Sequence, residues 1–302
     1  MDRGEGTDRT DAEIYATPTA ADLAAMPTVY RDDLFKDMVV LVSGGAGGIG
    51  LATSVLFGRL GATLVSCSRD ETKMAEFEAA MASLEIPCFT KVMTIRDADQ
   101  VDDLVRDRLE RVPGVSWERY GRLDVLVNNA GGQFAAPAMD ISPNGWRTVV
   151  DTNLNGSWFM MQAAAHRWRD NKQPGCVVNI AAVLGMLTSS IPHSLAARAG
   201  VIHLTKGLCV EWAPYDIRLN SIAVGVIASP GLTHYPDAAK PSFDHNVVRR
   251  LGSVQDIAQA AVYLAGPTGE FINGTVLTVD GGAEVWGEYW PLGRPDHFRV
   301  DY

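Results

Sequence analysis

A glycine-rich segment, residues 43–50, carries the sharpest chemical signal in the chain. It reads SGGAGGIG and includes Ser43, Gly44, Gly48, Ile49 and Gly50, directly after an apolar run. Glycine tolerates positive φ, lets an anion approach bare backbone, and allows a helix to lie close to a strand. Backbone amides and the dipole at the start of a following helix bind phosphate groups. The segment predicts a loop that holds the pyrophosphate of a dinucleotide, and the alternative is a merely flexible turn.

The next apolar run ends in Ser68, Arg69 and Asp70. In dinucleotide-binding folds an acid at this strand end holds the ribose 2′-hydroxyl of NAD, whereas an arginine accommodates the 2′-phosphate of NADP. Ser68 followed by Arg69 therefore favours NADP(H) over NAD(H). Two alternatives stay open, because a shift of one or two residues makes Asp70 the ribose acid, and Arg69 can also be a solvated surface charge.

The elements that must position these residues alternate along the chain. Short, nearly continuous apolar runs are typical of strands buried on both faces of a parallel sheet, and they span 39–42, 63–67, 89–93, 125–127, 176–180, 218–222 and 275–279. Helix-length segments lie between them at 49–60, 71–83, 101–111, 146–169, 196–213 and 254–265. This pattern predicts an α/β fold, a single Rossmann-type doubly wound domain with a seven-stranded parallel sheet flanked by helices.

Three regions follow from the pattern. Residues 1–36 lack a clear period and are predicted as a mostly unstructured N-terminal tail, with the ordered part starting at Met38. Residues 37–285 form the predicted catalytic domain, and residues 286–302 an aromatic C-terminal tail that either lines a substrate pocket or packs in an interface. Within the domain, residues 111–122 are expected to be a surface insertion and residues 233–248 a substrate lid.

The composition of the chain argues against several classes of binding partner. The chain has 302 residues and a net charge of −10. An acidic surface argues against nucleic acid and against an anionic membrane surface as partners. Four cysteines, Cys67, Cys88, Cys176 and Cys209, show no metal-ligand spacing, so no metal site is expected. We expect a cytoplasmic protein with buried, neutral thiols and a small-molecule substrate.

Several motifs occur in the order found in the short-chain dehydrogenase/reductase family. Residues 43–50 resemble its TGxxxGIG loop, residues 123–132 its NNAG motif, and residues 151–156 its helix with a catalytic asparagine. Residues 220–229 resemble the segment that touches the nicotinamide, with Val224 in place of the usual proline, and residues 279–282 match the final strand and turn. The resemblance covers about residues 35–284. It implies cofactor contacts by Asn128, Ala130, Gly131, Gly225 and Ile227.

The catalytic residues depart from the family pattern of Asn, Ser, Tyr and Lys. The resemblance places Asn153 at the first position, but Ser194 stands at the Tyr position, Arg198 at the Lys position, and Ala181 or Ala182 at the Ser position. A serine hydroxyl is a far weaker acid than an activated tyrosine, and arginine is not a base at neutral pH, although it can bind the ribose hydroxyls of the cofactor. His193, Ser189 and Ser190 are further candidate proton donors, and the alternative for His193 is a helix cap.

These departures affect some reactions more than others. Reduction of a C=O needs a proton donor for the alkoxide, whereas reduction of an enoyl thioester collects charge on the thioester oxygen, where hydrogen-bond donors stabilise it. Residues 128–134, 144–146, 193–214 and 294–297 also resemble the branch with peroxisomal trans-2-enoyl-CoA reductases and their bacterial relatives, near the 2,4-dienoyl-CoA reductases. This resemblance implies an NADP(H)-dependent reductase of the C=C of an acyl thioester, and a homo-oligomer, either tetramer or dimer. The alternatives are a carbonyl reductase or alcohol dehydrogenase with an unusual proton donor, and a non-catalytic dinucleotide-binding homologue.

Overall fold

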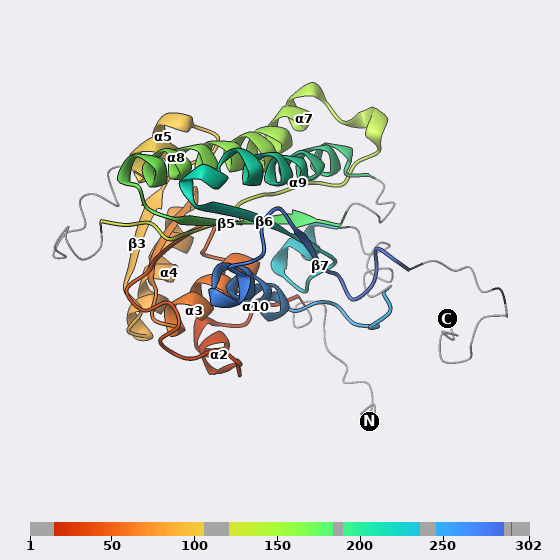
Figure 1. The fold of residues 1–302 in the computed structure, drawn as a ribbon. Helices are drawn as coiled ribbons and strands as arrows, with labels where there is room; N and C mark the ends of the chain where they lie inside the picture. The colour runs from red at the N-terminus through yellow and green to blue at the C-terminus, as the bar shows by residue number, and fades with distance from the viewer. Residues whose placement is uncertain (1–14, 106–120, 184–189, 236–245, 287–290, 292–302) are drawn as a thin grey trace.

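A seven-stranded parallel sheet forms the middle layer of the molecule (Figure 1). The computed structural model describes residues 15–105, 121–183, 190–235, 246–286 and 291. The strand order is β3-β2-β1-β4-β5-β6-β7, which confirms the predicted fold class. The strands are β1 (Val39–Ser43), β2 (Thr63–Ser68), β3 (Cys88–Val92), β4 (Val125–Asn128), β5 (Gly175–Ala182), β6 (Ile217–Val224) and β7 (Val276–Val279).

Helices cover both faces of the sheet (Figure 1). One face carries α2 (Ala20–Ala25), α3 (Gly48–Arg59), α4 (Glu71–Ser83) and α10 (Val254–Ala265). The other carries α5 (Ala98–Asp103), α8 (Gly156–Asn171) and α9 (Pro192–Glu211). Each face encloses its own apolar core, and the central strands β1 and β4 are buried along their whole length. Burial on both faces explains why these strands are continuous apolar runs in the sequence.

The long helix expected at residues 146–169 contains a local change of pitch. It starts with α7 (Pro143–Val150), continues through a π-helical turn, η3 (Asp151–Asn155), and runs on as α8. In this turn the Gly156 amide donates to the Asp151 carbonyl, five residues back. Single π turns within α-helices accommodate one additional residue and often occur at functional sites. The turn contains Asn153, the predicted catalytic asparagine.

The N-terminal region is more ordered than the sequence suggests. Thr19 and Asp22 form a capping box at the start of α2, and Leu23 and Phe35 are fully buried in the core. Phe35 packs edge-on against Phe57 with ring centroids 4.7 Å apart. The expectation of a mostly unstructured tail up to residue 36 is therefore wrong for residues 15–36, because isolated apolar residues without periodicity still bury their side chains against α3.

Short 3-10 helices connect several elements: η2 (Ala138–Asp140), η4 (Ala213–Tyr215), η5 (Pro230–His234) and η7 (Pro267–Gly269). No helix within the described ranges has the length and apolar character needed to cross a membrane. The expected insertion at 111–122 and lid at 233–248 lie largely outside the described residues, as do residues 1–14 and most of the C-terminal tail.

Candidate functional site

The candidate site lies at the carboxyl ends of the central strands. After β1 the chain enters α3 on one face of the sheet, and after β4 it continues to the helices on the other face. Adjacent strands whose connections leave in opposite directions open a crevice that binds ligands in this class of fold. A cavity of about 310 Å³ lies there, lined among others by Gly44, Ile49, Ser68, Arg69, Ala130, Gly131, Thr94, Asn129 and Ser229. Six predicted cofactor residues thus meet in one cleft.

The glycine loop has the geometry of an anion cradle. Gly44 and Gly48 have φ of 66° and 52°, a backbone conformation that L side chains rarely adopt. The N-cap of α3, Gly47, provides no side-chain hydrogen bond, and the first turn of α3 contains no acidic residue. The first amides of this helix therefore have no capping side chain, and they provide the positive end that a pyrophosphate requires.

Substitution of Gly50 tests the cradle. A Cβ on Gly50 would lie 2.2 Å from the Gly44 carbonyl oxygen and 2.5 Å from Asn129 Nδ2. We expect Gly50→Ala to displace the loop and to weaken NADPH binding by at least about tenfold, or about 1.4 kcal/mol, as measured by quenching of protein fluorescence. Gly47→Ala is the matched control, since its Cβ would meet no atom within 4 Å. Equal affinities of the two variants would contradict this role for the loop.

The residues at the end of β2 lie in different surroundings. Arg69 is exposed and lines the cleft. Asp70 instead caps α4, since its Oδ1 accepts the Lys73 amide at 3.0 Å. A carboxylate engaged in this cap is directed at the helix rather than at the cleft. Ser68 accepts the Asp70 amide at 3.3 Å, which places the hydroxyl beside Arg69.

Two predicted cofactor residues lie behind the cleft wall. The buried Ser43 hydroxyl accepts the amides of Asn129 and Ala130, both at 3.1 Å, and so ties β1 to the loop after β4. The Asn128 side chain is buried as well and donates to Asn179 Oδ1 at 2.9 Å. Asn129, which sequence reasoning missed, lines the cleft instead, because successive side chains at a strand end point in opposite directions.

The loop after β6 lies on the side of the cleft opposite the glycine loop. A Cβ on Gly48 would lie 3.8 Å from Ser229 Cβ, so the two loops face each other. The Gly225 amide donates to the Val279 carbonyl at 3.1 Å, which anchors the loop to β7. Ile227, predicted as a cofactor contact, has its side chain buried in the core. The signal for Ser229 was its place in the segment that resembles the family's nicotinamide contact.

Asn153 organises the floor of the site. It is fully buried, its Oδ1 accepts the Gly132 amide, and its Nδ2 donates to the Gly132 carbonyl, both at 2.9 Å. Nδ2 also lies 3.4 Å from Ser194 Oγ. The structure thus brings together two of the predicted catalytic residues. The pair of hydrogen bonds to Gly132 determines which end of the Asn153 side-chain amide acts as the donor.

Arg198 reaches the same place from α9. Its Nη1 donates to the Ile180 carbonyl at 2.6 Å, and a Cβ on Gly131 would lie 2.2 Å from its Nη2. Within the part of the chain that the structure describes, no carboxylate pairs with it. Burial lowers the pKa of the Arg198 guanidinium to about 10, so the group still carries its charge at neutral pH. Among the described residues it is therefore a cation without a carboxylate partner, next to Gly131 at the edge of the cleft.

His193 is fully buried at the start of α9. Its Nδ1 accepts the amide of the next residue, Ser194, at 2.8 Å, although the N-cap of α9 is Ile191, and its ring packs edge-on against Phe134. The Nε2 atom is buried without a hydrogen-bond partner among the described residues. The Ser190 carbonyl accepts the Ala136 amide, and Ser189 lies outside the described residues.

The cysteine in the cleft is a buried, neutral thiol. Cys67 lines the cavity from β2, and burial raises the pKa of its thiol to about 12. Burial also raises the pKa of Cys176. A thiol must ionise to attack or to bind a metal, so both groups act as small apolar side chains.

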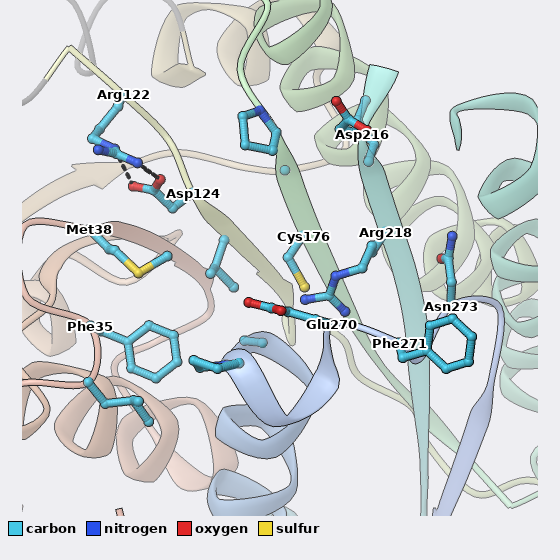
Figure 2. Close-up of a pocket in the computed structure, with 18 of the residues that line it drawn as sticks. Phe35, Met38, Arg122, Asp124, Cys176, Asp216, Arg218, Glu270, Phe271 and Asn273 are labelled. Carbon is cyan, nitrogen blue, oxygen red and sulfur yellow. Dashed lines mark hydrogen bonds and ion pairs between the residues drawn. The ribbon is translucent and has the colours of Figure 1, made fainter. Parts of the chain in front are cut away.

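A separate cavity of about 720 Å³ lies at the opposite edge of the sheet, where β4, β5 and β6 begin (Figure 2). Two of the charged groups around it make structural contacts within the protein. Arg122 pairs with the buried Asp124, and Arg218 Nη1 donates to three backbone carbonyls. Ligands of doubly wound folds bind at the carboxyl edge, so this cavity is distinct from the candidate site.

The sheet order, the glycine cradle and the cleft at the strand crossover define a dinucleotide-binding protein of the Rossmann class. Residues 44–284 match the family model described as Enoyl-(Acyl carrier protein) reductase. The chain belongs to the short-chain dehydrogenase/reductase family, as the motifs suggested.

Known relatives support this assignment. The chain is 35% identical over 251 residues to a probable 2,4-dienoyl-CoA reductase of Bacillus subtilis, which covers 80% of this chain and 95% of that protein. It is 32% identical to the peroxisomal 2,4-dienoyl-CoA reductase of Arabidopsis thaliana, over 90% of each. Among solved structures, a citronellol catabolism dehydrogenase of Pseudomonas aeruginosa superimposes with a TM-score of 0.74 at 29% identity, covering 85% of this chain and 99% of that one.

Proposed function

We propose that the protein is an NADPH-dependent reductase of the C=C of an unsaturated acyl-CoA thioester. The proposal is carried by the pair Ser194 and Arg198 at the start of α9, which the resemblance to the family places at its Tyr and Lys positions. Arg198 presents a permanent cation to the cleft, which suits charge that develops on a thioester oxygen. The closely similar 2,4-dienoyl-CoA reductases favour a thioester substrate of this kind.

In this proposal each of the site residues has a separate role. When bound, a reduced nicotinamide supplies the hydride. The amides at the start of α3 hold the pyrophosphate, and Asn153 holds the loop at Gly132 in place. Arg198 holds the ribose hydroxyls of the nicotinamide half and adds positive potential where the thioester oxygen gains charge.

The preference for NADPH is part of the proposal. It is supported by Arg69 on the cleft surface and by the engagement of Asp70 as a helix cap. A planar guanidinium binds a phosphate through two parallel hydrogen bonds. With Asp70 engaged in the helix cap, Arg69 and the Ser68 hydroxyl would hold the 2′-phosphate of the cofactor.

We also propose that the protein is cytoplasmic and that it assembles into tetramers or dimers. An oligomer is supported by apolar side chains on the outer surface, such as Val210 of α9, which is 73% exposed. Several relatives are named as peroxisomal enzymes, so the location depends on the host cell.

The test is NADPH oxidation by the purified protein with three substrates in parallel: a medium-chain trans-2-enoyl-CoA, a trans,trans-2,4-dienoyl-CoA and a 3-oxoacyl thioester. The third is included because the chain is 30% identical to a 3-oxoacyl-[acyl-carrier-protein] reductase of Thermotoga maritima over 249 residues. We expect turnover of an unsaturated thioester with NADPH preferred over NADH. Turnover of the 3-oxo substrate alone would favour a carbonyl reductase. NADPH binding without turnover on any of the three would favour a non-catalytic homologue.

A further inference from the structure

An uncharged apolar segment, residues 134–139, follows the cleft in the sequence and faces the solvent. It reads FAAPAM, and every residue in it except Ala136 is exposed. The Phe134 ring is 42% exposed, and the Met139 side chain is fully exposed. Soluble proteins rarely expose contiguous apolar surface, and such surface often marks a groove for a ligand or an interface.

The segment is held in this exposed position by contacts with the rest of the fold. The Ala136 amide donates to the Ser190 carbonyl at 2.9 Å, close to the start of α9. The Phe134 ring packs edge-on against the buried His193, with ring centroids 4.6 Å apart. A Cβ on Gly145 would lie 2.9 Å from Phe134 Cζ, so the far end of the ring reaches α7. The exposure of the segment is therefore a property of the folded loop.

The segment is continuous with the candidate site. Gly131 is part of the cleft lining, and Asn153 holds the next residue, Gly132, at both its amide and its carbonyl. Phe134 comes three residues after Gly131, so their Cα atoms are at most about 11 Å apart. The segment itself lies outside the lining of the cavity. Its position thus suits a part of a ligand that extends out of the cleft beyond the dinucleotide.

The charge of this region indicates which part of an acyl-CoA would lie there. Residues 125–139 contain no charged side chain, and the first one after them is Asp140. The phosphate groups of CoA are bound by cations and repelled by a carboxylate. A hydrocarbon chain, in contrast, gains free energy from each methylene group that leaves water. The segment therefore suits the acyl end of the thioester and not the CoA end.

We propose that residues 134–139 bind the hydrocarbon chain of the acyl thioester and give the protein a preference for medium and long chains. The inference rests on the proposed function, since it assumes a thioester whose reacting carbons lie in the cleft. The chain then leaves the cleft past Gly132 and lies against Phe134. It reaches Met139 only if it is long.

The test is calorimetric titration of butanoyl-, octanoyl- and dodecanoyl-CoA into the protein loaded with NADP⁺. In the wild type each methylene group that the segment covers should tighten binding by up to about fourfold, so that affinity rises along the series. Phe134→Ser should weaken the binding of octanoyl- and dodecanoyl-CoA by about tenfold and leave butanoyl-CoA unchanged. Met139→Ser should weaken the binding of dodecanoyl-CoA alone.

The Met139 side chain is fully exposed, so its replacement should leave the fold intact. Val29→Ser is the matched control, because Val29 is 92% exposed and its neighbour Thr28 contacts Gln259 of α10, on the other face of the sheet from α9. Wild-type affinities in both Phe134→Ser and Met139→Ser would overturn the inference. An equal loss for all three ligands would also overturn it, since the effect would then concern the CoA end. A smaller particle mass of Met139→Ser in sedimentation, with unchanged affinities, would show that a second copy of the chain covers the segment instead.

Binding and turnover together distinguish failure of this inference from failure of the proposed function. If affinity depends on chain length through residues 134–139 but no unsaturated thioester is reduced, the proposed function is overturned and the chain site stands. If an unsaturated thioester is reduced but affinity does not depend on chain length, the chain site is overturned and the function stands. A wild type that binds none of the three ligands overturns both.

Discussion

Replacing Arg69 with glutamate is expected to lower the affinity for NADPH on the order of a hundredfold and to leave the affinity for NADH unchanged or improved. A hydrogen bond to a charged group contributes about 1.5–3 kcal/mol, and the substitution also places a like charge opposite the 2′-phosphate. The residue is exposed, so the fold should tolerate the change. Titration of each cofactor by fluorescence measures both constants.

The control for this charge reversal is Arg31→Glu. Arg31 is 79% exposed in the N-terminal region, beside Asp33, and the substitution changes the net charge by the same amount. If NADPH affinity falls equally in both variants, the effect comes from the overall field of the protein and Arg69 has no specific role. If it falls in neither, the 2′-phosphate is bound elsewhere.

The second large effect is expected at Arg198. Arg198→Met should reduce kcat/KM on the order of a hundredfold, the loss that follows removal of one electrostatic contact to developing charge. Arg198→Lys keeps the charge and should retain part of the activity. Both values come from steady-state rates with the substrate that the wild type reduces.

The same substitution should not destabilise the protein. Burial lowers the pKa of Arg198 to about 10 in the folded chain, below its unfolded value, so between these values the folded state binds fewer protons and stability rises with pH. At neutral pH the buried charge therefore costs stability, and the cost is relieved only as the pH rises through about 10. We expect the Tm of Arg198→Met at pH 7 to equal or exceed that of the wild type. A fall of several degrees would show that the bond to the Ile180 carbonyl is structural.

The parts of the fold that were predictable have strong local signals. Strands buried on both faces are continuous apolar runs, and the start of α4 and of α10 is marked by the caps Asp70 and Ser253. The N-terminal region escaped prediction because Leu23 and Phe35 contact residues distant in sequence and follow no period. A capping box at residues 19–22 was the one local sign of a helix there.

The glycine loop and Asn153 were predicted from local motifs, and the structure places both beside the cleft. The details of the site depend on contacts between distant residues. Gln133 and Tyr235 are 102 residues apart and meet only in the fold. Likewise, whether Asn128 or Asn129 faces the cleft depends on the direction of one strand end. Neither feature has a signature in a single sequence.

The π turn at residues 151–155 constrains the number of residues in the helical segment that runs from α7 to α8. A π turn holds one residue more than a regular α-helical turn, and regular turns have the better hydrogen-bond geometry. Loss of one residue at this point would therefore leave an intact helix, but it would rotate Asn153 away from Gly132. Folding alone does not require the additional residue. The number of residues between α7 and α8 is thus determined by the need to place Asn153 against Gly132. An insertion or deletion here would disturb the site while leaving the fold intact.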